Sequence, residues 1–137
     1  MATASDTITR ALRMINVVAI GETPGAGYSS DALEVLNDML HGWAKNGVDL
    51  GHITMALGDT HRTHDSFLEG IRANLAVRLA GQYGRPVPDW VSKLATDSFA
   101  AFQAHTMEFS DDLKADSALR PQYFGRRNYG SYDFEKG

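Results

Sequence analysis

One amphipathic stretch, ALEVLNDMLHGWAKNG at residues 32–47, constrains the fold of this chain more than any other feature. Its large apolar residues recur at spacings of three and four, which predicts a helix with one buried stripe. These residues are Leu33, Leu36, Met39, Leu40 and Trp43. We expect Ser30 or Asp31 to cap the helix, with Glu34 completing a capping box. Asn46-Gly47 is expected to end it in a left-handed turn.

Three further amphipathic patterns predict helices at about residues 7–18, 65–83 and from 88 or 89 toward 113. Ser5 or Asp6 is expected to cap the first of these. The stripes expected to be buried are Ile8, Leu12 and Ile15; Leu68, Ile71, Leu75 and Leu79; and Trp90, Leu94, Phe99 and Phe102. The sequence therefore predicts an all-α fold, a small four-helix bundle in which short loops favour antiparallel packing.

The segment between the second and third of the four expected helices, residues 47–63, has no helical pattern. Ile53, Met55 and Leu57 alternate with smaller or polar residues, which is a weak strand signal. Gly51 bounds this alternation on its N-terminal side. The pattern leaves two alternatives open, a short β-ribbon insertion and an irregular but ordered loop.

The last 20 residues lose all periodicity, and we expect residues 1–117 to form the helical body and residues 118–137 an extended arm. The arm is rich in tyrosine, phenylalanine and arginine, the residue types that anchor protein interfaces. Its candidate anchors are Arg120, Tyr123, Phe124, Arg126, Arg127, Tyr129, Tyr132 and Phe134. An arm that orders on a partner is the favoured interpretation, and a tail folded back on its own domain is the alternative.

Composition narrows the class of protein. The formal net charge is −4, which argues against a protein whose main role is to coat nucleic acid. Cysteine is absent, so disulfides, zinc–thiolate sites and thiol nucleophiles are excluded. We also expect neither a signal peptide at residues 1–6 nor a membrane span, because no apolar run approaches the required length of about 20 residues. An intracellular protein or a component of a particle fits best.

The sequence contains no strong motif for a catalytic or metal-binding site. His61 and His64, flanked by Asp59 and Asp65, have metal-ligand types, but no second cluster completes a site, so we favour a polar loop. The remaining histidines are isolated in the sequence and are expected to be structural or solvated. They are His41, His52 and His105. No Gly-x-Ser-x-Gly motif is present, and we expect no catalytic site, metal or cofactor.

Two patterns could contact phosphate. The glycine-rich residues 21–27 precede a helix, but they lack the Gly-Lys-Ser/Thr ending of a P-loop, so a connecting loop is favoured. Five arginines could bind DNA backbone, and ion pairs between helices or subunits are the favoured alternative. These arginines are Arg72, Arg78, Arg85, Arg126 and Arg127. Trp43 and Trp90 could stack a ligand, but core packing explains both more simply.

Three segments together resemble one protein family. They are ALR to GETP at residues 11–24, the stretch at 32–47, and NLAVRLAGQYG at 74–84 followed by PVP at 86–88. In this order and spacing they resemble the tail accessory factors of short-tailed phages, which include the head-completion adaptors below the portal. The resemblance covers about residues 8–105, and the arm matches in its extended, aromatic character.

The resemblance implies a structural virion protein and no enzymatic activity. Such subunits form a ring on the portal after DNA packaging, extend the DNA channel, help retain the genome and present a surface for the tail. The expected partners are therefore the portal protein, through the arm, neighbouring copies in the ring, and a downstream tail protein. Packaged DNA would pass without sequence-specific binding, and no membrane partner is expected. The implied location is the neck of the virion, and the host cytoplasm during assembly.

Two functions of other classes remain as alternatives. A helical DNA-binding regulator would use a helix-turn-helix, although the acidic balance and the lack of a basic recognition helix count against it. A small enzyme would use the loop that carries His61 and His64 as its site.

Overall fold

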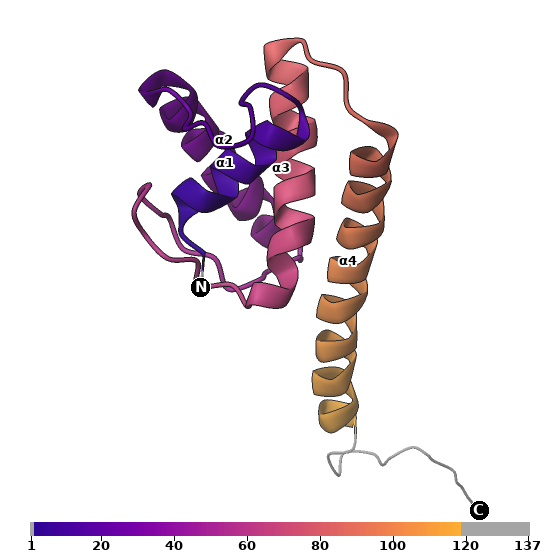
Figure 1. Cartoon of the computed structure of the whole chain (residues 1–137). Coiled ribbons are helices and arrows are strands. Elements are labelled where there is room, and N and C mark those ends of the chain that lie inside the picture. Colours follow the sequence, from indigo (N-terminus) through magenta and orange to yellow (C-terminus); the bar gives the residue numbers. More distant parts are fainter. Residues whose placement is uncertain (1, 119–137) are drawn as a thin grey trace, which may run out of the picture. The chain divides into compact units, whose positions relative to one another are not determined.

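The computed structural model describes the backbone of residues 2–118 and the side chains of residues 2–107. Its elements are α1 (Ala4–Met14), α2 (Ala26–Lys45), the 3-10 turn η1 (Asp65–Phe67), α3 (Leu68–Tyr83) and α4 (Asp89–Ala118) (Figure 1). No β-strand occurs among residues 2–118, and the fold is all-α, as predicted. None of these helices is long and apolar enough to cross a membrane.

The chain divides into two units, Met1–Gln103 and Ala104–Gly137, and α4 runs through both. The first unit contains α1, α2 and α3 and the N-terminal half of α4, and its buried residues form one hydrophobic core. In the second unit the described residues 104–118 continue α4 as an uninterrupted helix. The core and all the side-chain clusters discussed below belong to the first unit.

Helix α1 begins earlier than its apolar pattern predicts. Thr3 caps it, because the Thr3 Oγ1 accepts from the Asp6 amide and the Asp6 carboxylate accepts from the Thr3 amide, each at 3.2 Å. This reciprocal capping box takes the place of the predicted Ser5 or Asp6 cap. The helix ends at Met14, four residues before the predicted end, and Asn16 adopts a positive φ of 60°. Its predicted stripe is buried: Ile8, Leu12 and Ile15.

Helix α2 also begins earlier than predicted, and the predicted cap at Ser30 or Asp31 is wrong. Its N-cap is Gly25, which makes no side-chain cap. The extra turn carries Tyr28, whose ring packs edge-on against the ring of Tyr83 at the end of α3, with centroids 5.2 Å apart. No local sequence signal predicts this tertiary contact. The end at Lys45 and the left-handed Gly47, with a φ of 96°, confirm the predicted stop.

The core forms where α1 packs against both α2 and α3 (Figure 1). The predicted α2 stripe is buried except for Leu33, which is half-buried, and Ala32 points inward beside it. The predicted α3 stripe is buried throughout: Leu68, Ile71, Leu75 and Leu79. Gly84 ends α3 in the left-handed conformation with a φ of 66°.

The register of α4 differs from the prediction. Trp90 is 59% exposed, Leu94 and Phe99 are half-buried, and the buried positions are Val91, Ala95 and Phe102. Contacts with α3 set this register. The Asn74 side-chain amide donates to the carbonyl oxygens of Gly70, at 2.8 Å, and Ala95, at 3.1 Å. Gly70 has no side chain, so α4 approaches α3 closely at that point.

The segment at residues 46–64 is an ordered loop, so the β-ribbon alternative is wrong. It forms only one isolated antiparallel bridge within residues 2–118, between Thr60 and Thr3. The Asn37 side chain of α2 fixes the loop through two hydrogen bonds to the backbone of Met55. It donates to the Met55 oxygen at 3.0 Å and accepts from the Met55 amide at 3.1 Å. Loop oxygens in turn accept from the first free amides of α1, at Ala4 and Ser5.

Candidate functional site

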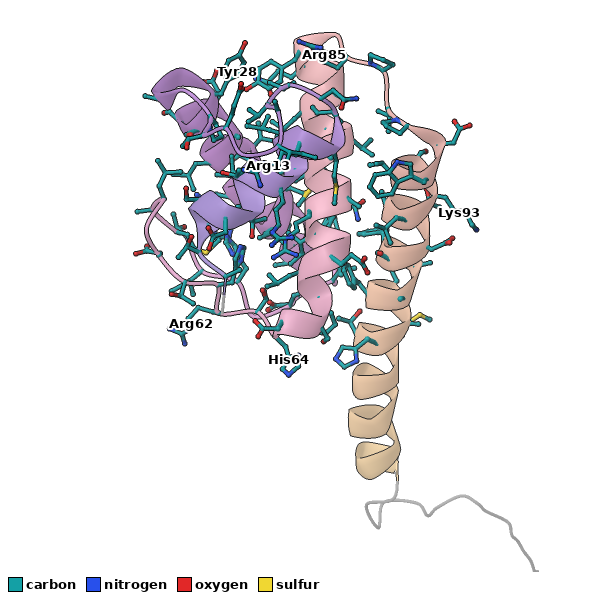
Figure 2. All side chains as sticks on the ribbon, viewed as in Figure 1. Arg13, Tyr28, Arg62, His64, Arg85 and Lys93 are labelled. Atoms are coloured by element: carbon teal, nitrogen blue, oxygen red, sulfur yellow. The ribbon has the colours of Figure 1, made fainter. Side chains whose placement is uncertain are left out.

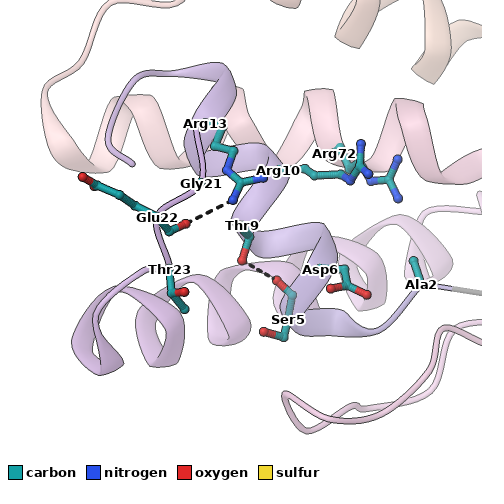
Figure 3. A pocket seen from close by; sticks show the side chains of 10 residues that line it. All are labelled: Ala2, Ser5, Asp6, Thr9, Arg10, Arg13, Gly21, Glu22, Thr23 and Arg72. Atoms are coloured by element: carbon teal, nitrogen blue, oxygen red, sulfur yellow. Dashed lines mark hydrogen bonds between the residues drawn. The ribbon is translucent and has the colours of Figure 1, made fainter. Parts of the chain in front are cut away.

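Three arginines line a pocket between α1 and α3, where Arg10 and Arg72 lie close together and Arg13 turns toward Glu22 (Figure 3). Arg10 and Arg13 stand three residues apart on α1, so they share a helix face, and Arg72 reaches them from α3. They line an open pocket of about 590 Å³ together with the second half of the α1–α2 loop. The other lining residues are Ala2, Ser5, Asp6, Thr9, Gly21, Glu22 and Thr23.

These guanidinium groups make few hydrogen bonds within the described part of the protein. Arg13 Nη2 donates to the backbone oxygen of Glu22 at 3.1 Å, which ties α1 to the loop (Figure 3). The Nε atoms of Arg13 and Arg72 are buried and have no hydrogen-bond partner. Among the described side chains of residues 2–107, one ion pair forms, Lys93–Asp97 at 3.1 Å, so no carboxylate pairs with any of the three arginines. Buried polar groups without a partner are uncommon in proteins, and each calls for an explanation.

Burial, hydrogen bonds and neighbouring charges shift two pKa values at the pocket. Partial burial, followed by the neighbouring charge of Arg10, lowers the pKa of Arg72. The pKa of Asp6 is also lowered, first by the hydrogen bond from the Thr3 amide and then by that from its hydroxyl, so Asp6 is ionised in its capping role. The Glu22 side chain points away from the arginines (Figure 3). The pocket therefore has a locally positive wall formed by like charges from two helices.

An exposed apolar surface adjoins the three arginines. They also line a second pocket, of about 360 Å³, with Met14, Ile20, Glu69 and Trp90. Ile20 is 93% exposed and Trp90 is 59% exposed, so the prediction that Trp90 packs in the core is wrong. We call Ile20, Trp90 and Met14 the Trp90 surface. Tryptophan and arginine are both enriched among the residues that dominate protein interfaces.

The prediction of a polar loop at His61 and His64 holds for one residue only. His64 is exposed and caps η1, since its Nδ1 accepts from the Ser66 amide at 3.1 Å. His61 is only 2% exposed, and its Nε2 lies 2.7 Å from the hydroxyl of Thr7. Burial, followed by the charge of Arg72, lowers the pKa of His61. The hydrogen bond with the hydroxyl of Thr7, which lies 54 positions away in the sequence, provides a partner for this buried histidine.

The Thr7–His61 pair has the atoms of a nucleophile and a base, but its burial argues against catalysis. Thr7 is fully buried and His61 nearly so, which leaves no path for a substrate to the hydroxyl. No group of three or more His, Cys, Asp or Glu side chains that could hold a metal occurs in the described part of the chain. The contact therefore acts as a structural link between α1 and the loop at 46–64.

His41 and His52 are isolated in the sequence but meet in the structure, where their rings pack with centroids 4.7 Å apart. The Asn37 side-chain oxygen lies 3.1 Å from His52 Nε2, and the Thr54 hydroxyl lies 2.9 Å from His41 Nε2. Burial, followed by the neighbouring His41, lowers the pKa of His52 to about 4. Both rings are thus part of the polar network that fixes the loop on α2. His105 is exposed on α4.

The remaining predicted candidates lie elsewhere. Trp43 is buried against Phe99 and Phe102, with ring centroids 5.1 and 5.8 Å away, which confirms its core role. Arg78 and Arg85 are exposed and line neither pocket beside Arg72. The eight arm anchors lie outside the described residues: Arg120, Tyr123, Phe124, Arg126, Arg127, Tyr129, Tyr132 and Phe134.

The sequence analysis missed Arg10 and Arg13. Their spacing of three on an amphipathic helix was the available signal, since it places both side chains on one face. Of the favoured connecting loop at residues 21–27, Gly21, Glu22 and Thr23 line the arginine pocket, and the last two residues begin α2.

No protein-family model matches the chain, and a search of curated proteins finds no match either.

Proposed function

We propose that the chain is a structural virion protein, a head-to-tail adaptor that forms a ring below the portal, extends the DNA channel and helps retain packaged DNA. The supporting observation is where the three family-like segments fall. Residues 11–24 supply the end of α1 and its loop, residues 32–47 supply α2, and residues 74–84 supply the second half of α3. These helices share one core, so the segments are parts of one packing unit.

Binding alone, without chemistry, is the proposed mechanism. The Trp90 surface offers a large exposed aromatic ring, and the adjoining Arg10, Arg13 and Arg72 form no ion pair within residues 2–107, so two residue types enriched at protein interfaces are available there. In a cyclic ring each copy contacts its neighbours through two different patches, and the Trp90 surface would be one of them. The arm at residues 118–137 would attach each copy to the portal through its tyrosine, phenylalanine and arginine anchors. The remaining partners would be a downstream tail protein and passing DNA.

Co-purification with the portal protein of the same virus tests this proposal. The full chain carrying an affinity tag should retain the portal and be displaced by untagged chain. Trp90→Ala should weaken ring formation on the portal, because the change removes the largest exposed aromatic group of the body. Ile53→Ala is the matched control, since Ile53 is 49% exposed and lies in the loop at 46–64, outside the Trp90 surface.

Two results would count against the adaptor function, and a third would count against the Trp90 surface alone. A full chain that fails to retain the portal would remove its main support. A chain that instead forms a dimer and binds one DNA sequence in preference to others would favour the helical regulator. Equal ring formation by the Trp90 and Ile53 variants would exclude the Trp90 surface from the ring contact.

A further inference from the structure

We propose that the pocket between α1 and α3 is a binding site for a phosphate group. Arg10 and Arg72 would hold the phosphoryl oxygens, with Arg13 and the hydroxyl groups of Ser5 and Thr23 at the rim. This site is independent of the assembly role proposed above and stands on the geometry of the arginines alone.

Three arginines and two carboxylates line the pocket, so positive charge is in excess. Arg10 repels Arg72, and Asp6, Glu69 and Asp65 attract Arg72, but no carboxylate among residues 2–107 forms an ion pair with either arginine. Asp6 is nearby, but the Thr3 amide donates to one of its oxygens, and the Glu22 side chain points away. An anion between the arginines would replace repulsion with attraction to both.

Most hydrogen-bond donors of these arginines have no partner among residues 2–107. Arg13 Nη2 donates to the Glu22 backbone oxygen, and this hydrogen bond holds the Arg13 guanidinium group at the pocket wall. The Nε atoms of Arg13 and Arg72 are buried and have no partner in the protein. A guanidinium group binds an oxyanion best when two of its N–H groups donate to two oxygens. These two Nε atoms are out of reach of a ligand in the open pocket, so a bound oxyanion would use the terminal Nη groups, and Arg10 and Arg72 make no side-chain hydrogen bond within residues 2–107.

Phosphate fits this arrangement of arginines better than a carboxylate does. A carboxylate has two oxygens and suits one guanidinium fork, whereas a tetrahedral phosphate offers three or four oxygens in different directions. Here the forks approach from α1 and from α3. A pocket of about 590 Å³ also admits a group larger than a carboxylate. Phosphoryl oxygens could come from a free phosphate or phosphomonoester, or from the diester backbone of DNA.

A titration followed by amide NMR tests the site on the intact chain. Sodium phosphate, compared with sodium chloride at equal ionic strength, should shift the amides of residues 5–13, 21–23 and 72. Arg10→Gln and Arg72→Gln should each weaken phosphate binding about tenfold to a hundredfold, as expected for losing a charge-assisted hydrogen bond. Arg62→Gln is the matched control, because Arg62 is exposed and lies far from Arg13 (Figure 2). It should bind phosphate as the unchanged chain does.

Two oligonucleotide probes separate the sources of phosphate. A short single-stranded DNA with a 5′-phosphate and the same strand with a 5′-hydroxyl are titrated in parallel. Binding of the 5′-phosphorylated strand alone supports a phosphomonoester site, and equal binding of both with the same arginine dependence supports a backbone site. The proposal is overturned if phosphate and both strands leave these amides unshifted. It is equally overturned if folded Arg10→Gln and Arg72→Gln chains bind as tightly as the Arg62→Gln control.

Discussion

Replacing Gly70 with alanine tests the close approach of α4 to α3. A Cβ at this position would lie 2.5 Å from both the Ser98 Cβ and the Phe102 Cζ. The Ser98 Cβ is bonded to the helix backbone, so relief requires α4 itself to move. Overpacking of this kind costs about 1–3 kcal/mol, and alanine recovers about 1 kcal/mol of helix propensity. Because two contacts are too short, we expect a net loss of about 1–2 kcal/mol in the free energy of unfolding.

Gly81→Ala is the matched control for this experiment. Gly81 also lies in α3 and is exposed, and an added Cβ there meets no heavy atom within 4 Å. This variant should gain up to about 1 kcal/mol. Urea denaturation followed by far-ultraviolet circular dichroism measures both free energies. If Gly70→Ala proves as stable as Gly81→Ala, the helices do not touch at Gly70, and the account of the α4 register is wrong.

Three further predictions concern the core and the histidines. Trp43→Ala should lower the free energy of unfolding by about 3–5 kcal/mol, because the ring is 7% exposed among Phe99 and Phe102; a loss below about 1 kcal/mol in urea denaturation would contradict this packing. His61→Ala should cost about 1–3 kcal/mol by leaving the buried Thr7 hydroxyl unpaired, while the exposed His64→Ala costs less, and equal losses in the same assay would refute the assigned burial. The pKa of His52 falls from 6.5 to about 4 on folding, so the unfolded chain binds more protons between these values. The free energy of unfolding should therefore be highest above pH 6.5 and decrease as the pH falls toward 4. In thermal melts, His52→Gln should lose less stability over this range than the unchanged chain does. Identical pH profiles of the two chains would contradict the prediction.

Local signals predicted part of the fold well. The stripe of α3 and its end at Gly84 follow from spacing and from one glycine, and both were confirmed. The register of α4 could not be obtained in this way, because Gly70 and Asn74 on another helix decide which face of α4 turns inward. The start of α1 was missed for a different reason: Thr3 and Asp6 form a local capping box that precedes the apolar pattern.

The candidate site was less predictable than the fold. Arg10 and Arg13 are neighbours on one helix, but Arg72 joins them only after α1 and α3 pack. His61 appeared polar in sequence because its hydroxyl partner, Thr7, is 54 positions away. The prediction for Trp90 fails in the opposite direction. Its size suggested burial, but its neighbour Val91 occupies the inward face of α4 and Trp90 is exposed. In each case a contact between distant segments determined the outcome.

The most direct test of the central claim is attachment to isolated portal rings. The full chain and a chain ending at residue 117 are each mixed with the portal protein, and bound copies are counted after size-exclusion chromatography. The account predicts that the full chain elutes with the portal, while the shortened chain keeps its helical circular dichroism and elutes alone. A full chain that elutes apart from the portal would contradict the adaptor function, and a shortened chain that still binds would contradict anchoring by the arm.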